Sequence, residues 1–121
     1  MSEKVDLFFF RGCTTCRSVK AWLQQQEIEL ATREFFVDRF SESELRTMID
    51  DRPVSDFFSW SSPRFRKLGL AREELDDDRL LAMMIEEPRL IRRPLIAIDG
   101  AVLNPVSGGD RIIEMLKSLL G

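Results

Sequence analysis

Residues 7–16 read Leu-Phe-Phe-Phe-Arg-Gly-Cys-Thr-Thr-Cys, in which an apolar run leads directly into a Cys-x-x-Cys motif. We expect residues 5–10 to form an interior strand covered on both sides, because the run is apolar on both faces of a pleated strand. Beyond Cys16, the apolar residues Val19 and Leu23 recur at helical spacing, which predicts a helix. The motif is therefore expected at a strand-to-helix junction, with Cys16 on the inward face of the helix.

The Cys-x-x-Cys spacing at the start of a helix predicts a redox pair. A thiolate is the reactive form of cysteine, and a helix N-terminus with a nearby cation lowers the pKa of a thiol. Arg11 and Arg17 flank the motif and are candidate cations. We expect Cys13 to act as the nucleophile at the helix start. Cys16, one turn further in, is expected to attack the mixed disulfide formed on Cys13.

Three other roles for the two cysteines are open. A zinc site with this spacing requires further cysteine or histidine ligands, and the chain has two cysteines and no histidine, so no metal site is predicted. Free cysteine is also common in hydrophobic cores, and a structural disulfide is the third alternative. A disulfide across so short a loop constrains the unfolded chain little. The catalytic interpretation is therefore preferred.

The composition predicts a single domain, residues 1–121. A chain of 121 residues is long enough to bury one core but too short for two. Its net charge of −3 gives no basic surface for nucleic acid, and no apolar run reaches transmembrane length. No signal-peptide pattern precedes the first strand. We therefore expect a cytoplasmic protein without nucleic-acid or membrane partners, in a compartment that keeps thiols reduced.

Residues 28–37 predict a second strand, which completes a β-α-β unit with the motif in its first turn. A helical insertion is predicted over residues 39–90. Ser41 and Glu44 form a capping-box pattern within it, and the acidic residues among 73–78 fit exposed first turns and helix caps. A solvated face, rather than a metal site, is the preferred interpretation of this acidic run.

Strand signals return at residues 95–98, and Asp99-Gly100 is the strongest hairpin-turn signal in the chain. A last helix is predicted from near Asp110. One face of this helix is expected to carry five apolar residues, Ile112, Ile113, Leu116, Leu119 and Leu120. The order β-α-β, helical insertion, β-β-α predicts an α/β thioredoxin-like fold with a mixed central sheet.

Three arginines, Arg89, Arg92 and Arg93, precede Pro94 at the start of the third predicted strand. Clustered guanidinium groups bind oxyanions or carboxylates through charge-assisted hydrogen bonds. For Arg89 and Arg92 we prefer pairing with nearby surface carboxylates. Arg93 differs because it directly precedes a proline, and X-Pro bonds are the ones that adopt the cis form at modest cost.

Four segments of the sequence match motifs that are shared by the members of one protein family. They are Gly-Cys-Thr-Thr-Cys-Arg at residues 12–17, Lys-Ala-Trp-Leu at 20–23, Phe-Arg-Lys-Leu at 65–68 and Leu-Ile-Arg-Arg-Pro-Leu-Ile at 90–96. Together they resemble the arsenate reductase and Spx family over nearly the whole chain. The resemblance implies a thioredoxin-like fold with a helical insertion. It also implies that Cys13 is the nucleophile, that Pro94 is cis and faces it, and that Arg93 helps to bind an oxyanion.

Two positions depart from the pattern of arsenate reductases linked to glutaredoxin. Those reductases carry two further arginines around the anion, and the resemblance places Ser61 or Ser62 at the first position and Asn104 at the second. A lost charge-assisted hydrogen bond typically costs about 1.5–3 kcal/mol, so weaker arsenate binding is predicted. Arg11 or Arg64 is a candidate replacement. Those reductases also tend to lack the second cysteine, whereas Spx-type regulators have it.

The leading hypothesis is a cytoplasmic thiol-disulfide oxidoreductase of this family. Cys13 and Cys16 are its catalytic pair. Arg17 and Arg93 favour the thiolate or bind a carboxylate, and Pro94 presents backbone to the substrate. No bound cofactor is expected. The electron donor is expected to be glutathione or a thioredoxin or glutaredoxin system, and the substrate is a thiol or disulfide.

Two alternatives follow from the resemblance. One is arsenate reduction with glutathione and glutaredoxin. The other is an Spx-type regulator, which uses the Cys-x-x-Cys motif as a disulfide switch and binds the C-terminal domain of the RNA polymerase α subunit. Trp60, in the helical insertion, is either a partner contact or, preferably, a core residue.

Overall fold

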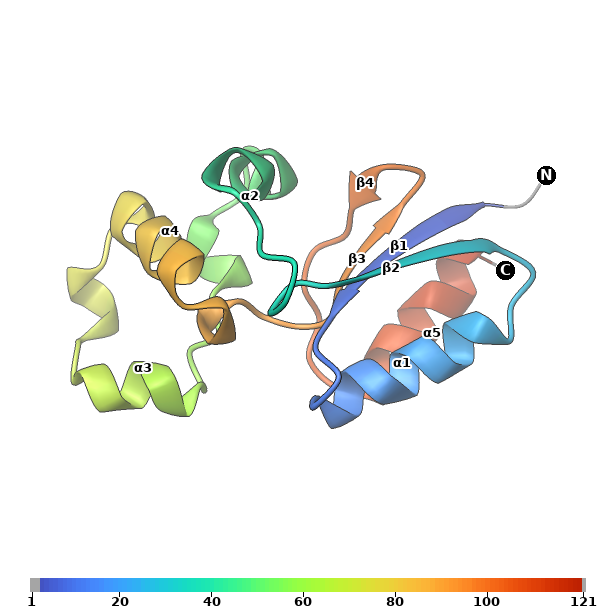
Figure 1. Ribbon diagram of the computed structural model, residues 1–121, viewed down its shortest axis with the longest axis horizontal. Helices are drawn as coiled ribbons and strands as arrows, with labels where there is room; N and C mark the ends of the chain where they lie inside the picture. The colour runs from blue at the N-terminus through green and yellow to red at the C-terminus, as the bar shows by residue number, and fades with distance from the viewer. Residues whose placement is uncertain (1–2, 121) are drawn as a thin grey trace. The chain divides into compact units, whose positions relative to one another are not determined.

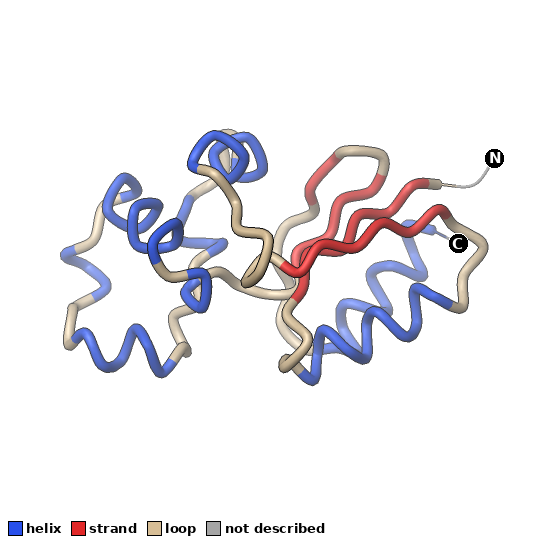
Figure 2. Tube along the Cα trace, in the orientation of Figure 1, coloured by secondary structure: helices blue, strands red, loops and turns tan. Residues whose placement is uncertain are grey.

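The computed structural model describes residues 3–120, which fall into two compact units. The first unit contains the chain up to Phe35 and from Arg93 onward, and the second comprises residues 36–92. Figures 1 and 2 show that the first unit holds the sheet and that the second is built of helices and loops. Both cysteines belong to the first unit.

The first unit alternates strands and helices: β1 (Lys4–Phe9), α1 (Thr14–Gln24), β2 (Glu29–Glu34), β3 (Leu95–Ile98), β4 (Ala101–Val102) and α5 (Gly109–Leu120). The strands form one sheet in the order β2-β1-β3-β4. β2 runs parallel to β1, whereas β3 is antiparallel to both β1 and β4. The mixed sheet and the interior position of β1 confirm the predictions for the sheet.

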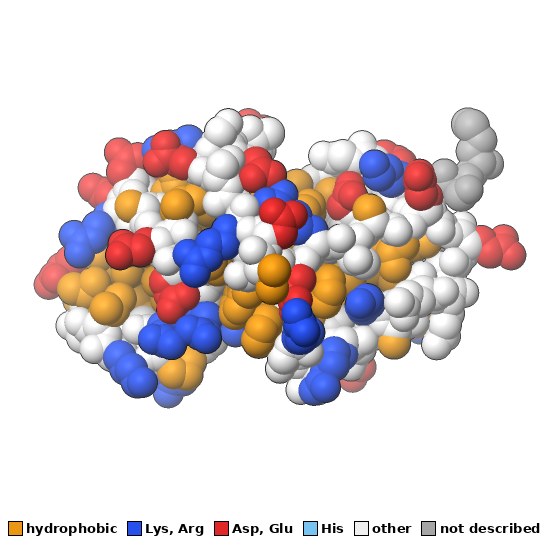
Figure 3. Space-filling view, viewed as in Figure 1, with side chains coloured by type: hydrophobic (Ala, Val, Ile, Leu, Met, Phe, Trp, Pro, Cys, Tyr) orange, Lys and Arg blue, Asp and Glu red, His pale blue; other side chains and the backbone are white. Residues whose placement is uncertain are grey.

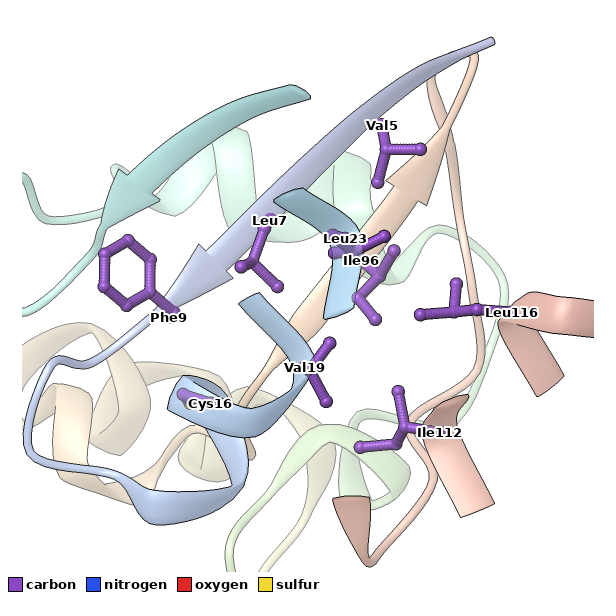
Figure 4. Close-up of a cluster of buried hydrophobic side chains, with 9 residues drawn as sticks. All are labelled: Val5, Leu7, Phe9, Cys16, Val19, Leu23, Ile96, Ile112 and Leu116. Carbon is purple, nitrogen blue, oxygen red and sulfur yellow. The ribbon is translucent and has the colours of Figure 1, made fainter. Parts of the chain in front are cut away.

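The core of the first unit lies between one face of the sheet and the helices α1 and α5. Figure 4 shows its buried side chains, which are Val5, Leu7 and Phe9 of β1, Cys16, Val19 and Leu23 of α1, Ile96 of β3, and Ile112 and Leu116 of α5. The helical spacing of the α1 residues places all three on the inward face. The predicted inward position of Cys16 is confirmed.

Two details of the predicted strands are wrong. β1 is not covered equally on both faces, since Asp6 and Phe8 are only half-buried while α1 and α5 pack on the other face. β2 ends at Glu34 rather than at residue 37. The pairing of β2 with β1 stops there because β1 also ends. The Phe35 N–H still donates to the carbonyl of Phe9 at 3.2 Å. The chain that follows β1 then turns toward the motif.

The predicted apolar face of α5 does not hold at one position. Leu119 is 51% exposed, whereas Ile112 and Leu116 are buried. Residues four positions apart form a nearly straight stripe along a helix. Ile112, Leu116 and Leu120 follow that stripe, and Leu120 is packed against the core. Leu119 lies beside the stripe and faces solvent.

The second unit consists of short helices: α2 (Glu42–Ile49), α3 (Pro63–Leu68) and α4 (Asp77–Glu86), with 3-10 turns at Val54–Phe57, Arg72–Glu74 and Pro88–Leu90. The predicted capping box at α2 is confirmed. The Ser41 hydroxyl accepts the N–H of Glu44 at 3.1 Å, and the Ser41 N–H donates to the Glu44 carboxylate at 3.0 Å. Asp76, in the acidic run, caps α4 by accepting the N–H of Arg79 at 2.8 Å.

The second unit has its own buried apolar residues, which include Phe57, Phe58, Leu80, Leu81 and Met84. Trp60 packs within this unit, since its ring centroid lies 4.5 Å from that of Phe58 and 5.2 Å from that of Phe65. Its indole N–H donates to the carbonyl of Ser55 at 3.0 Å. These contacts agree with the preferred interpretation of Trp60 as a packing residue.

Charges of both signs are interspersed on the face of each unit drawn in Figure 3. No helix within residues 3–120 combines the length and the apolar character needed to cross a membrane.

Replacement of Leu116 tests the packing of α5. Leu116→Ala is expected to lower the free energy of unfolding by about 2–5 kcal/mol, because it leaves a cavity in the core. The matched variant Leu119→Ala removes the same atoms from an exposed site and is expected to cost about 0.5 kcal/mol or less. Urea denaturation of both variants measures the difference. Equal losses would contradict the assignment of the buried stripe.

Candidate functional site

Cys13 is the N-cap residue of α1. Its backbone is extended, with φ −92° and ψ 119°, and its N–H donates to the carbonyl of Phe10 at 3.0 Å. Its sulfur accepts the N–H of Cys16 at 3.4 Å. The first N–H groups of a helix and its dipole stabilise a negative charge at this position. Cys13 is therefore a half-buried residue at the positive end of a helix.

Cys16 has the opposite environment. Its side chain is completely buried in the core of the first unit. Burial and, to a smaller extent, the neighbouring sulfur of Cys13 raise the pKa of Cys16 to about 12, against the opposing effects of a Phe10 backbone hydrogen bond and the charge of Arg93. Cys16 is therefore a neutral thiol near neutral pH. Both cysteines are free thiols, so the structure represents the dithiol state.

Arg93 and Pro94 enter the site from the segment that leads into β3. The Arg93–Pro94 peptide bond is cis, as the family resemblance implied, and Pro94 is buried. The guanidinium of Arg93 lies 6.0 Å from the centroid of the Phe10 ring, within reach of a cation–π interaction. Its positive charge lowers the pKa of Cys16. The structure thus brings Arg93 to the cysteine pair.

Phe10 and Gly12 are site residues that the sequence analysis did not single out. A Cβ atom on Gly12 would lie 2.5 Å from Cε2 and 2.7 Å from Cζ of the Phe10 ring. The missing side chain therefore leaves room for the ring on which Arg93 rests. The available signal was the position of Phe10, which is the last apolar residue before the motif.

Arg11 does not serve the cysteines directly, because its charge is paired elsewhere. Its guanidinium Nη2 lies 2.8 Å from Oε1 of Glu34, and its backbone N–H donates to Oε2 of the same carboxylate at 2.7 Å. The hydrogen bond from the Arg11 side chain lowers the pKa of Glu34. This ion pair ties the loop before the motif to the end of β2.

The other candidate arginines differ in their surroundings. Arg17 is exposed, and its side chain forms no hydrogen bond or ion pair with the described residues. Arg89 pairs with Glu87 at 3.5 Å, as expected for a surface residue. Arg92 donates through Nη1 to the carbonyl of Asp56 at 3.3 Å. The role of Arg17 at the thiolate stays a prediction.

The positions that lack the arginines of arsenate reductases carry neutral side chains. Ser62 is buried and caps α3, where its hydroxyl accepts the N–H of Arg64 at 3.2 Å. Ser61 and Asn104 are exposed. Arg64, a candidate replacement, pairs with Glu87 at 3.5 Å. Within residues 3–120 no three His, Cys, Asp or Glu side chains are grouped so that they could hold a metal ion.

The difference between the two thiols can be measured by alkylation with iodoacetamide. At neutral pH, Cys13 is expected to react first, because Cys16 is buried and protonated. In a Cys13→Ser variant, alkylation of Cys16 is expected to accelerate about tenfold per pH unit between about pH 7 and 9, since burial, the largest cause of the raised pKa of Cys16, is unchanged in this variant. A rate that levels off below about pH 9 would show that burial does not control this thiol.

Comparison with known proteins agrees with this architecture. Residues 8–104 match the ArsC family. The chain is 32% identical over 94 residues to the "Global transcriptional regulator Spx" of Streptococcus pyogenes serotype M1, covering 76% of this chain and 70% of that protein. It is 29% identical over 98 residues to the "Regulatory protein MgsR" of Bacillus subtilis, covering 79% and 78% of the two chains.

The fold is also shared with solved structures. An arsenate reductase from Vibrio cholerae superposes with a TM-score of 0.78 at 24% identity, covering 96% of this chain and 100% of that one. Similarity at this level of identity establishes the fold, and the predicted thioredoxin-like fold is confirmed.

Proposed function

Because the chain belongs to the ArsC family, we propose that it is a thiol-disulfide oxidoreductase of this family in which Cys13 and Cys16 form one redox pair. The contrast between the two thiols carries the proposal. The sulfur of Cys13 accepts an N–H at the start of a helix and is half-buried. Cys16 lies one turn further along, fully buried, with a pKa raised to about 12. Cys13 is suited to attack a substrate disulfide, and Cys16 is suited to attack the mixed disulfide that then forms on Cys13.

The proposed exchange has two steps. The Cys13 thiolate attacks one sulfur of a substrate disulfide; a bond forms between them, the substrate S–S bond breaks, and the leaving thiolate takes the electron pair and picks up a proton. Cys16, once deprotonated, attacks the sulfur of Cys13 and releases the second substrate thiol. The protein dithiol is oxidised by two electrons, and the substrate disulfide is reduced to two thiols.

Attack by Cys13 in the first step changes the pKa of Cys16, which reacts in the second step. Burial is the main cause of the high pKa of Cys16, and the hydrogen bonding and charge of the Cys13 sulfur add to it. Once Cys13 is in a mixed disulfide, its sulfur carries no charge, and that contribution disappears. Arg93 acts in the same direction, because its charge already lowers the pKa of Cys16. The resolving thiolate is therefore easier to form after a substrate has bound covalently.

The remaining roles in the proposal rest on the sequence pattern and on the family resemblance. Arg93 and the exposed Arg17 support the thiolate or a carboxylate of the substrate, and Pro94 presents backbone to it. The electron donor is glutathione or a thioredoxin or glutaredoxin system in the cytoplasm, and the protein needs no bound cofactor. Arsenate reduction is not proposed, because Ser61 and Asn104 stand where its arginines are expected.

Substitution of each cysteine tests the assigned roles. Cys13→Ser is expected to abolish reduction of a model disulfide, because the attacking sulfur is gone. Cys16→Ser is expected to stop after the first step and to accumulate a mixed disulfide on Cys13, which mass spectrometry of the intact protein detects. Equal residual activity in the two variants would remove the division of roles.

The regulator relatives favour a second candidate, a redox-switched regulator. The chain is 32% identical to a protein named a global transcriptional regulator, and it has the two cysteines that a disulfide switch requires. Its partner would then be the C-terminal domain of the RNA polymerase α subunit.

A pull-down with that domain separates the two candidates. A regulator is expected to bind it in one redox state of the Cys13–Cys16 pair and to bind it more weakly, by about tenfold or more, in the other. The Cys16→Ser variant, which cannot form the internal disulfide, is the control. Absence of binding in both redox states would leave the enzymatic proposal alone.

A further inference from the structure

A tight turn over residues 10–13 connects β1 to the start of α1 and ends on Cys13. The Cys13 N–H donates to the carbonyl of Phe10 at 3.0 Å, so Arg11 and Gly12 are the two central residues of the turn. The hydrogen bond that closes a turn of this kind does not use the N–H of the first central residue. The Arg11 N–H therefore takes its acceptor from outside the turn.

Glu34 supplies that acceptor. It is the last residue of β2 and is paired in register with Phe9, the last residue of β1, so its side chain reaches the turn that follows β1. Oε2 of Glu34 accepts the backbone N–H of Arg11 at 2.7 Å. The Arg11 side chain binds the same carboxylate through Nε, at 3.0 and 3.1 Å, and through Nη2, at 2.8 Å. One carboxylate thus holds both the backbone and the side chain of a single turn residue.

The two kinds of bond differ in what they contribute. The Arg11 side chain is 75% exposed, and an ion pair with an exposed arginine is screened by water and costs side-chain entropy, so it contributes little. The backbone N–H has no side-chain freedom to lose, and a hydrogen bond from an N–H to a charged carboxylate is among the stronger ones. We therefore expect the bond to the Arg11 N–H to fix the turn.

The position of the turn matters because it determines where the sulfur of Cys13 lies. That sulfur accepts the N–H of Cys16 at 3.4 Å, which requires the extended conformation of Cys13 at the helix start. Gly12 lies between Arg11 and Cys13, and a glycine restricts the backbone least of all residues. The turn therefore depends on contacts from outside it to keep Cys13 in place.

We infer that Glu34 is a positioning residue for Cys13. By accepting the N–H of Arg11, it holds the turn so that the sulfur of Cys13 stays at the start of α1. The thiolate is the reactive form of cysteine, and the helix start stabilises it only while the sulfur lies there. This inference rests on the proposed thiol-disulfide exchange for its functional meaning and adds a residue that controls the rate of the first step.

Three variants separate the backbone bond from the ion pair. Glu34→Ala removes both. Arg11→Gln removes the ion pair but keeps the N–H at position 11 and the carboxylate that accepts it. Glu34→Gln removes the charge but keeps an amide oxygen that can accept the same N–H.

Alkylation of the reduced, full-length protein with iodoacetamide at neutral pH measures the reactivity of Cys13, and mass spectrometry of the peptide with both cysteines assigns the modified one. Glu34→Ala is expected to lower the rate constant of Cys13 about tenfold, the effect of losing one charge-assisted hydrogen bond. Arg11→Gln is expected to lower it about twofold or less, and Glu34→Gln is expected to lie between the two. The rate constant with hydroxyethyl disulfide is expected to fall in the same order.

Glu29→Ala is the matched control. Glu29 lies on the same strand, is exposed, and its side chain forms no hydrogen bond or ion pair with the described residues. Its replacement removes the same carboxylate from β2 and is expected to leave Cys13 unchanged. Alkylation of Cys16 is a second control, because a variant that loosened the whole unit would expose this buried thiol and accelerate its reaction. It is expected to stay at the wild-type rate in all four variants.

Three outcomes would overturn the inference. An unchanged rate for Cys13 in Glu34→Ala would show that the turn does not depend on Glu34. Equal losses in Arg11→Gln and Glu34→Ala would assign the effect to the ion pair. Faster alkylation of Cys16 in Glu34→Ala would show a general loss of packing. If the wild-type protein fails to reduce hydroxyethyl disulfide while the alkylation rates follow the expected order, the positioning role is supported and the proposed function alone fails.

Discussion

Burial of Cys16 is the constraint on which the site depends. Its side chain is packed with Leu7 and Phe9 of β1 and with Val19 of α1, and this packing sets the rotation of α1 about its axis. With Cys16 turned inward, Cys13 must lie at the exposed beginning of the helix, one turn earlier. The same contacts that stabilise the first unit therefore divide the two thiols into a reactive one and a protected one.

The loop between β1 and α1, which carries the motif, is contacted by residues from both sides of β1 in the sheet. On the β2 side, the carboxylate of Glu34 binds both the side chain and the backbone N–H of Arg11. On the β3 side, Arg93 rests against the ring of Phe10, for which Gly12 leaves room. β1 lies between these two strands in the sheet, so its loop is fixed at two points.

Local sequence signals predicted the elements well where neighbouring residues determine the structure. The capping box of Ser41 formed as expected, and Asp99 and Gly100 adopt the positive φ angles of 49° and 86° that a tight hairpin turn requires. The predictions failed where residues distant in the sequence determine the structure. The end of β2 is set by the end of β1, and the exposure of Leu119 is set by the stripe of α5 that meets the core.

The sequence by itself determined the position of the two cysteines at a strand-to-helix junction, the inward direction of Cys16, the order of the elements and the family. These follow from periodicity and short motifs, which act between residues close in the chain. Only the tertiary structure decided which arginine meets the cysteines, since Arg11 is bound to Glu34 and Arg93 arrives from the far end of the chain. It also brought together the beginnings of α1 and α5. A long side chain such as arginine can reach several partners, and the sheet order decides which of them is near.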